Sequence, residues 1–595
     1  MSLAAIFVAT LASTSLTFAA QPVQSPPSLP PSVQPSQTPA SPEPVAPQTS
    51  ATPALPAASP SPSPSPSAAP LALGKTRLQL NRNANATIPI SGGVPPLRAT
   101  LSSPIADVQI DAAGTTLGLR GLVDGTATLT ISDATGASLT ATVLVGPNAS
   151  FVPSDVDVAL TGNPTADFAT AQIRAAIVRA AQPLPGASLV VGDATLPPAL
   201  APGIRIDAPV RVHADGANRY VDVDGFSNVH VTVAPAIAVV PTVLFYSDDP
   251  ENVRADGVLF RGTLTAQTPV RLYYYHQSAT PQRQIAIVLD APAGSAQVTV
   301  LGRGAGPNAA VMYVGQSATF RYLDDRSRGA GVNLDVPVGA PLEIFTGDRA
   351  LGPGDLVAGA LDFSIRSGDP VRVTVLSLSP GADVRALLGD DELPSDGRGR
   401  RGEYDLATPL PISLAYTVGA AEPPPVSVGN APIPNLRSGG RALAGDYGVV
   451  RPIDLSLTNP TAAPQVVYFY ELPIGYPVTT TIAFDGDPAP MRLQCAKNRN
   501  RYLVRAFTLP ANGNATVTGS YMTDGGSTYP LTFGLTATPP LPLPATMTEA
   551  DGCYPKPAGA PSASPSASSA SPSPAASPSP AAPAVSPAVP IPAAT

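Results

Sequence analysis

Proline most restricts what this chain can fold into, because 75 of its 595 residues are proline. Inside a helix, proline removes a backbone hydrogen bond and its ring clashes with the preceding turn. The chain also contains 50 glycines and no tryptophan, and only 13% of its residues are charged. We therefore expect a mainly β protein without long helices. At about 150 residues per domain, the length predicts roughly four folded units.

The two ends of the chain have the most biased composition. Residues 20–70 and 555–595 are dominated by proline, serine and alanine, and each stretch has one charged residue, Glu43 in the first and Lys556 in the second. Such segments cannot bury enough apolar surface to fold. We predict a disordered linker at residues 20–70 and a disordered tail at residues 555–595, each acting as a spacer.

Residues 1–19 are typical of a secretory signal peptide. An apolar stretch, Leu3–Leu11, precedes Thr17-Phe18-Ala19, which has small residues where the signal peptidase needs them. We predict cleavage after Ala19 and export to the periplasm, the cell surface or the medium. The segment departs from the usual pattern in that no Lys or Arg precedes the apolar stretch. An uncleaved membrane anchor is the alternative, but the apolar run is shorter than the ~20 residues needed to span a bilayer. No later stretch is long and apolar enough to span a bilayer.

The first folded unit, residues 71–147, shows the alternation of a half-buried antiparallel sheet. Apolar side chains alternate with threonine and serine in two runs separated by a turn at residues 133–136. The two apolar sets are Ala127, Leu129 and Ile131, then Leu139, Ala141, Val143 and Val145. This pattern predicts a β-hairpin over a core.

With the lead-in Gly121–Leu129, this hairpin resembles the bacterial immunoglobulin-like modules of exported proteins, and also the short β-domain at the front of secretin-type pilus proteins. Four further segments are similar to uncharacterised secreted bacterial proteins built of several β-domains. These segments are Tyr246–Glu251, Gly257–Leu259, Tyr273–His276 and Gly445–Val449. The resemblance implies an exported chain of tandem β-domains and brings no known activity.

Residues 148–239 contain the one helical pattern that we detect. Apolar residues recur at helical spacing from Ile173 to Ala181, behind Asn163-Pro164 and ahead of Pro183. We expect Asn163 to cap a helix that ends before Pro183 and packs on strands. This predicts a small α+β module.

The remaining chain reads as strands bounded by glycine, proline and aspartate. Residues 240–422 predict one large or two small β-sandwiches, and the boundary inside this region stays open. Residues 423–440, which begin with three prolines, predict a linker. Residues 441–554 predict a last β-sandwich.

Motifs for catalysis and for nucleic-acid binding are absent from the sequence. The net charge is -8, and no run of Lys or Arg could follow a phosphate backbone. The only histidines, His213, His230 and His276, are too far apart for a zinc motif, and no G-x-S-x-G occurs. Residues 302–306 are glycine-rich, but we expect a strand at Val311 rather than the helix that a phosphate loop needs. We therefore predict a protein that is not an enzyme and has no cofactor.

Carboxylates are the best candidates for metal binding. Four of them crowd one loop: Asp248, Asp249, Glu251 and Asp256. Ca²⁺ prefers oxygen ligands, so this loop is a possible calcium site, and a solvated loop is the alternative. Asp222 and Asp224 stand two apart on a strand, but two residues supply too few oxygens for Ca²⁺.

Two short tyrosine ladders are candidates for a ligand-binding face. Tyr273 and Tyr275 fall on one side of a predicted strand, and Tyr468 and Tyr470 repeat the spacing. If exposed, these rings could stack on sugars. The alternative is that they are buried in a core, because aromatic rings bury a large area.

The chain has only two cysteines, Cys495 and Cys553. Because pairing is the default in an oxidising compartment, we predict a disulfide that fastens the end of the last sandwich. Two free thiols, or a bond to a partner chain, are the alternatives.

These observations favour a non-catalytic exported protein that presents tandem β-domains for binding or adhesion. Its expected partner is a cell-envelope polymer, a glycan or another surface protein. Two alternatives stay open: a secreted carbohydrate-active or calcium-dependent enzyme with scattered carboxylates, and a subunit of a surface layer or pilus-like assembly. The ligand, the oligomeric state and attachment to the cell are not predicted.

Overall fold

A computed structural model of the chain describes residues 69–345, 350–408, 410–443 and 445–543. The predicted signal peptide, nearly all of the predicted linker 20–70, the tail 555–595 and Cys553 lie outside these residues. The described part of the chain is mainly β, as predicted, with three helices. None of these helices has the length and apolar character that crossing a membrane requires.

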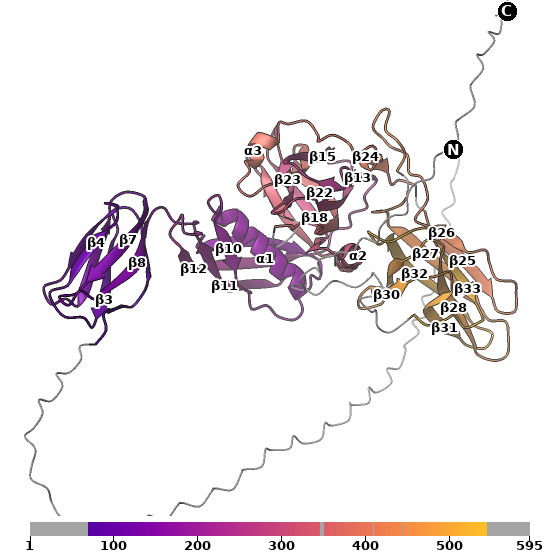
Figure 1. Ribbon diagram of the computed structural model, residues 1–595. Helices are drawn as coiled ribbons and strands as arrows, with labels where there is room; N and C mark the ends of the chain where they lie inside the picture. Colours follow the sequence, from indigo (N-terminus) through magenta and orange to yellow (C-terminus); the bar gives the residue numbers. More distant parts are fainter. Residues whose placement is uncertain (1–68, 346–349, 409, 444, 544–595) are drawn as a thin grey trace, which may run out of the picture. The chain divides into compact units, whose positions relative to one another are not determined.

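Residues 72–145 form a sandwich of two four-stranded sheets (Figure 1). The sheet orders are β1-β3-β6-β5 and β2-β8-β7-β4. The strands are β1 (Ala72–Leu73), β2 (Arg77–Leu80), β3 (Asn85–Ser91), β4 (Arg98–Leu101), β5 (Ala106–Ile110), β6 (Thr116–Gly121), β7 (Gly125–Ser132) and β8 (Ser138–Val145). The predicted hairpin is confirmed: β7 and β8 pair with Leu129 opposite Ala141, and both residues are buried.

The next region contains a twelve-stranded sheet. Its order is β10-β11-β12-β9-β20-β18-β22-β16-β13-β24, with β14 beside β16 and β19 beside β22. The strands are β9 (Asp155–Thr161), β10 (Ser188–Val191), β11 (Arg205–Asp215), β12 (Val223–Ala234), β13 (Val243–Ser247), β14 (Asn252–Val253), β16 (Val270–Ser278), β18 (Ala296–Leu301), β19 (Gly304–Asn308), β20 (Gly331–Val336), β22 (Leu356–Gly368) and β24 (Arg401–Asp405).

This sheet corrects the expected boundary at residue 239. Strand β9 of the predicted α+β module pairs with β20, so the module and the following region share one sheet. The pairing satisfies backbone groups of β9 that would otherwise form an open edge. Residues 148–239 are therefore one end of a larger domain.

A second sheet packs on one side of the first. Its order is β15-β23-β17-β21, and α3 (Val384–Leu387) follows it. The strands are β15 (Gly257–Leu264), β17 (Gln284–Asp290), β21 (Leu342–Phe345) and β23 (Val371–Leu378). Leu272, Tyr274 and Phe363 of the large sheet meet Ile287 and Val373 of the small one in a single core. The region predicted as one large or two small sandwiches is thus one layered domain.

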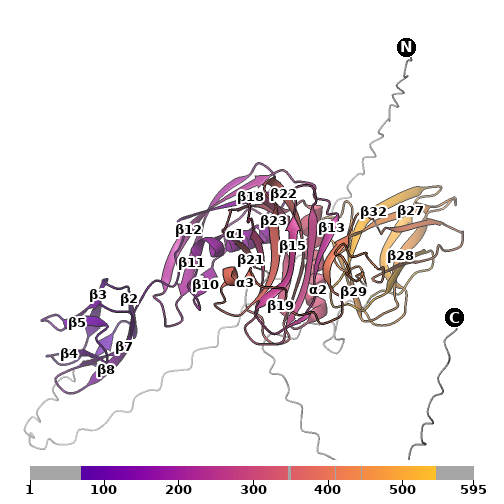
Figure 2. The same ribbon diagram turned by 90° about the horizontal axis from the view of Figure 1, so that it is seen from above.

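Helix α1 (Ala166–Ala181) covers the same side of the large sheet at strands β9 to β12 (Figure 2). The helix was predicted, but its cap is Thr165 rather than Asn163: the Thr165 hydroxyl accepts a hydrogen bond from the Phe168 amide. It ends at Ala181, before Pro183 as expected, and Gln182 adopts a left-handed conformation.

Helix α2 (Val311–Ser327) contradicts the strand expected at Val311. One of its faces packs on the other side of the large sheet, where the Tyr322 hydroxyl donates to Asp362 at 2.8 Å. Its opposite face packs on the last sandwich, where Gln316 Nε2 donates to the Leu493 carbonyl at 2.9 Å. Because α2 is buried on both faces, its buried residues include polar ones, and no helical apolar pattern marks it in the sequence.

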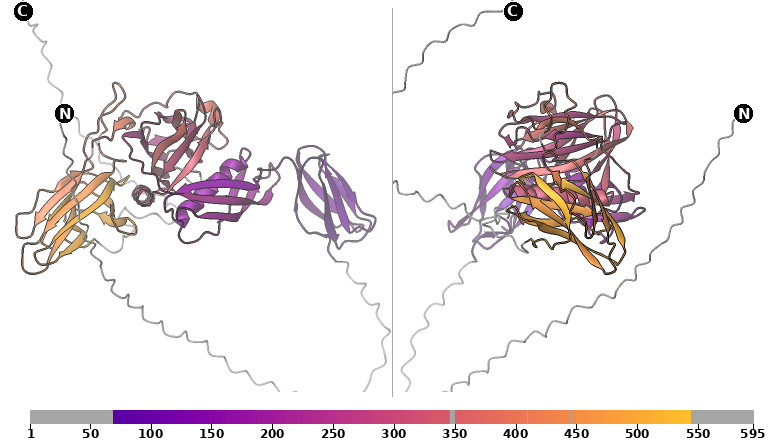
Figure 3. Two further views of the ribbon diagram at one scale, coloured as in Figure 1. Left: turned by 180° about the vertical axis from the view of Figure 1, so that it is seen from behind. Right: turned by 90° about the vertical axis from the view of Figure 1, so that its right-hand side faces the viewer.

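The last sandwich consists of sheets β25-β27-β32-β29-β30 and β26-β33-β28-β31, which Figure 3 shows in orange and yellow. The strands are β25 (Ile412–Thr417), β26 (Val426–Val428), β27 (Arg451–Thr458), β28 (Gln465–Pro473), β29 (Val478–Phe484), β30 (Met491–Ala496), β31 (Tyr502–Leu509), β32 (Asn514–Thr523) and β33 (Leu531–Thr536). Strands β25 and β26 lie before residue 441, so the sandwich starts earlier than predicted.

The predicted linker 423–440 is also corrected. It contains β26, and after β26 the chain returns to the large sheet, where Asn435 bridges Tyr404 of β24. A second bridge joins Ile433 to Leu443 within this segment, before β27 begins. These contacts hold the segment in place, whereas a linker would make few.

The last sandwich buries carboxyl groups, among them that of Glu471. Glu471 of β28 is completely buried, and neither of its carboxylate oxygens has a hydrogen-bond partner. Burial raises the pKa of Glu471 to about 8. The side chain is therefore mainly protonated at neutral pH.

Candidate functional site

The tyrosine ladders do not form the ligand-binding face that we considered. Tyr273 and Tyr275 are 3% and 8% exposed, and the loop at Gly525 packs against their rings. Tyr470 is 2% exposed, with the guanidinium of Arg501 over its ring, and Tyr468 is half-buried. The alternative of buried rings is confirmed for Tyr273, Tyr275 and Tyr470.

The acidic loop is not arranged as a calcium site. Arg400 pairs with Asp248 at 3.1 Å and with Glu251 at 2.8 Å. Asp249 accepts hydrogen bonds from the Ser395 hydroxyl and the Asp396 amide. These bonds engage Asp248 Oδ2, Glu251 Oε2 and both oxygens of Asp249, so the arrangement of this loop does not support the calcium prediction.

The other carboxylates considered for metal binding are also bound to protein groups. Asp256 pairs with Arg283 and accepts from the Ser379 hydroxyl. Asp222 and Asp224 have different partners: Asp222 accepts from Gln79 at 2.9 Å, and Asp224 pairs with Arg211 and His213. Throughout the described ranges, no three His, Cys, Asp or Glu residues are grouped so that they could hold a metal ion.

The structure brings together a serine and a histidine that the sequence did not connect. The Ser247 hydroxyl lies 2.8 Å from His276 Nε2, and His276 Nδ1 lies 3.0 Å from the Pro250 carbonyl. Burial lowers the pKa of His276 to about 4, so the ring is neutral, donates from Nδ1 and accepts from Ser247. Both side chains are fully buried, so a substrate cannot reach this pair in the described structure.

A set of accessible functional groups lies on strands β9 to β12. The side of these strands away from α1 is exposed, and we call it the β9–β12 face. It comprises Asp155, Asp157, Val190, Arg205, Asp207, Arg211, His213, Asp224, Phe226, Asn228 and His230. The intervening valines point to the other side and pack in the core with α1.

Hydrogen bonds organise the charged groups of the β9–β12 face. His230 lies between Asp207, 2.6 Å from Nδ1, and Asp155, 3.4 Å from Nε2. The bond to Asp207 raises the pKa of His230. Asp224 accepts from Arg211 at 3.2 Å and contacts His213 at 3.1 Å, and the Arg211 bond lowers the pKa of Asp224.

Two apolar side chains stand among these charges. Phe226 is 67% exposed and Val190 is 61% exposed. Single exposed apolar residues are common, and of the side chains on this face the aromatic ring of Phe226 and the arginines belong to the types enriched in protein interfaces. The available sequence signal was the alternation of polar and apolar residues from Asp155 to Val158. It predicts a strand with one solvent-exposed side, but it does not show whether another element covers that side.

Comparisons with known proteins give no family. No protein-family model matches the chain, and no curated protein matches it. Similar solved structures include the surface layer protein SbsC, domains 4–9, with 10% identity and a TM-score of 0.14, covering 78% of this chain and 83% of that one.

Two further similar structures are the N-terminal Ig1-2 module of the Drosophila receptor protein tyrosine phosphatase DLAR and the Bacteroides ovatus protein SGBP-B in complex with a mixed-linkage heptasaccharide. The first has 11% identity and a TM-score of 0.12, and covers 28% of this chain and 100% of that one. The second has 12% identity and a TM-score of 0.12, and covers 51% and 76%. TM-scores of this size are too low to support an argument about fold or function.

Proposed function

We propose that this chain is a non-catalytic exported protein that binds a partner through the β9–β12 face. The observation that carries the proposal is the exposure of this face. At the other end of the same sheet, α2 and its neighbours cover the equivalent side. Here Phe226, Val190 and the charged groups around them are left in solvent.

The chemistry of the face suits binding more than it suits catalysis. Its histidines are held by aspartates and lie on the exposed side of a sheet. The Ser247–His276 pair is buried. The carboxyls whose pKa values burial raises to about 8 and about 6, Glu471 and Asp524, are also buried, whereas a glycosidase needs its carboxyls in an open cleft.

The partner class follows from the sequence rather than from the structure. The predicted signal peptide and the predicted proline-rich spacers favour an exported chain that works at or beyond the envelope. Its expected partner is an envelope polymer, a glycan or another surface protein.

Binding of the full chain to isolated bacterial envelopes tests the proposal. Phe226→Ala removes the largest ring of the face, and we expect about tenfold weaker binding, the loss typical of an interface anchor. The matched control is Leu436→Ala, because Leu436 is 52% exposed and lies away from β9 to β12 in the sequence and the sheet. Equal binding by the wild type and Phe226→Ala would refute the role of this face, and recovery of the chain in the cytoplasm would refute export.

A further inference from the structure

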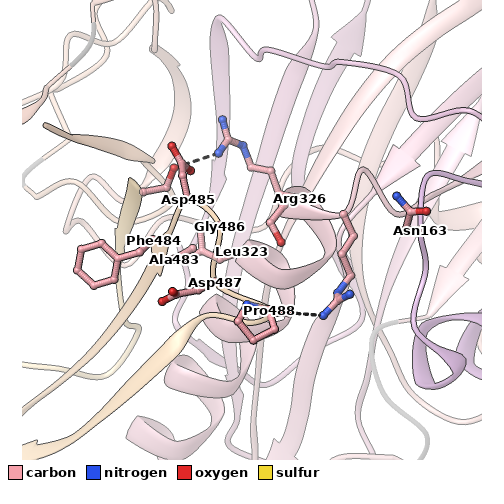
Figure 4. Close-up of a pocket in the computed structure, with 12 residues that line it drawn as sticks. Asn163, Leu323, Arg326, Ala483, Phe484, Asp485, Gly486, Asp487 and Pro488 are labelled. Atoms are coloured by element: carbon pink, nitrogen blue, oxygen red, sulfur yellow. Dashed lines mark hydrogen bonds between the residues drawn. The ribbon is translucent and has the colours of Figure 1, made fainter. Parts of the chain in front are cut away.

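A cleft separates the end of α2 from the β29–β30 turn (Figure 4). Its volume is about 500 Å³, within the range of small-molecule sites. Four segments that are far apart in the sequence line it: Asn163 after β9, Leu323 and Arg326–Arg328 at the end of α2, Ala483–Pro488 at the β29–β30 turn, and Ser520 of β32. None of these residues belongs to the β9–β12 face.

Strong hydrogen bonds fix both walls of the cleft. Asp487 accepts from both terminal nitrogens of Arg505, at 2.7 and 3.0 Å, which holds the turn. Arg328 donates to Asp324 at 2.9 Å and to the Pro488 carbonyl at 2.6 Å, which ties the end of α2 to the turn. The cleft is therefore formed before any ligand arrives, and binding need not order it.

Two charged groups of the lining keep bonding capacity for a ligand. Arg326 donates to the neutral hydroxyl of Ser520 at 3.3 Å and, within the described ranges, forms no ion pair. Asp485 accepts from the Thr518 hydroxyl through Oδ2, and its Oδ1 remains for a ligand. A guanidinium fork and a carboxylate thus line one small space without pairing to each other.

The charge balance of the lining indicates which class of ligand the cleft can bind. Arg326 and Arg328 face Asp485 and Asp487, so the lining carries no net charge. An anion would meet a carboxylate, and a cation would meet a guanidinium. Neighbouring hydroxyl groups on a ligand can satisfy both the arginine and the aspartate. Each hydroxyl can accept a hydrogen bond from an arginine and donate one to an aspartate. Leu323 and Phe484 also contribute to the lining, and both are almost fully buried.

We propose that this cleft binds a neutral sugar unit of a glycan, with its vicinal hydroxyls held between Arg326 and Asp485. This site is independent of the proposed β9–β12 face. It would add a second contact to the envelope at the junction of α2 and the last sandwich.

Calorimetric titration of the full chain with three soluble disaccharides tests the proposal: maltose, cellobiose and N,N′-diacetylchitobiose. We expect at least one to bind in the millimolar range, at roughly 4–6 kcal/mol. Asp485→Asn and Arg326→Leu each remove a charge-assisted hydrogen bond and weaken binding about tenfold or more. The matched controls Asp454→Asn and Arg366→Leu change exposed residues outside the cleft and leave binding unchanged.

Two measurements separate this proposal from the previous one. Phe226→Ala leaves disaccharide binding unchanged even if it abolishes envelope binding, because Phe226 does not line the cleft. Thermal unfolding shows whether Arg326→Leu is folded, and the exposed Asp485→Asn tests the cleft if it is not. Absence of binding by all three disaccharides overturns the proposal, as does binding of galacturonic acid or lysine in their place.

Discussion

The buried carboxyl of Glu471 predicts that the last sandwich loses stability as the pH rises. In the unfolded chain this group titrates near its ordinary pKa of 4.5, and in the folded chain burial raises that pKa to about 8. Folding therefore favours the protonated form. The stabilising contribution is fully present below pH 4.5 and is lost as the pH rises through about 8.

The size of the effect follows from the shift. One pKa unit corresponds to about 1.4 kcal/mol, so a rise from 4.5 to about 8 corresponds to about 5 kcal/mol between acid and alkaline conditions. Glutamine has the shape of the protonated acid and does not titrate. Glu471→Gln should therefore match the wild type near the acid end, become increasingly more stable than the wild type as the pH rises above 4.5, and differ most from it above about pH 8.

Urea denaturation at several pH values between 5 and 9 measures this difference, and tyrosine fluorescence can follow unfolding because the chain has no tryptophan. Asp524 also titrates in this range, since burial raises its pKa to about 6, so only the difference between wild type and variant isolates Glu471. Asp454→Asn, an exposed change in the same sandwich, is the control. Parallel pH profiles for the wild type and Glu471→Gln would refute the reasoning.

Three other predictions concern contacts between distant segments. Gly315→Ala should lower the melting temperature and cost about 1–3 kcal/mol, because a Cβ atom at Gly315 would lie 1.9 Å from the Gly525 carbonyl oxygen. Arg400→Leu should cost about 3 kcal/mol in urea denaturation, because it leaves the buried Asp248 carboxylate without its cation. The cysteine of β30, Cys495, is buried, and mass spectrometry of a non-reduced digest should find it linked to the only other cysteine of the chain.

Each of these predictions has an outcome that contradicts it. Gly389→Ala is the control for Gly315→Ala, since the nearest atom to a Cβ there is 3.8 Å away, and equal melting temperatures would show that α2 tolerates the larger residue. Arg400→Leu with unchanged stability would mean that Asp248 is protonated and needs no cation. Two singly alkylated cysteine peptides without a linked species would disprove the disulfide.

The parts of the fold that the sequence predicted well depend on short-range patterns. The β7–β8 hairpin follows from the alternation around Leu129, and α1 follows from apolar spacing that Pro183 brings to an end. The cap was misplaced by two residues because Asn163 and Thr165 are both good caps, and only the structure shows which hydroxyl or amide reaches the helix.

The parts that the sequence could not predict depend on long-range contacts. Strands β9 and β20 pair across about 170 residues, and no local signal announces such a partner. The acidic loop has the composition of a calcium site, but in the fold it pairs with Arg400, which lies 152 residues after Asp248 in the sequence. The exposure of the β9–β12 face could not be predicted either. The strand pattern distinguishes the two sides of the sheet, but it does not show that α1 covers only one of them.

The return of the chain to β24 affects how this protein can be divided. A cut before Ile412 would leave the large sheet without the Asn435 segment that bridges β24, and a cut after Leu443 would remove both β25 and β26 from the last sandwich. No single cut between the large sheet and the last sandwich therefore leaves both of them complete. Recombination can exchange them only together. The first sandwich ends before the large sheet begins, so one cut leaves all its strands intact and breaks side-chain contacts such as the one between Gln79 and Asp222.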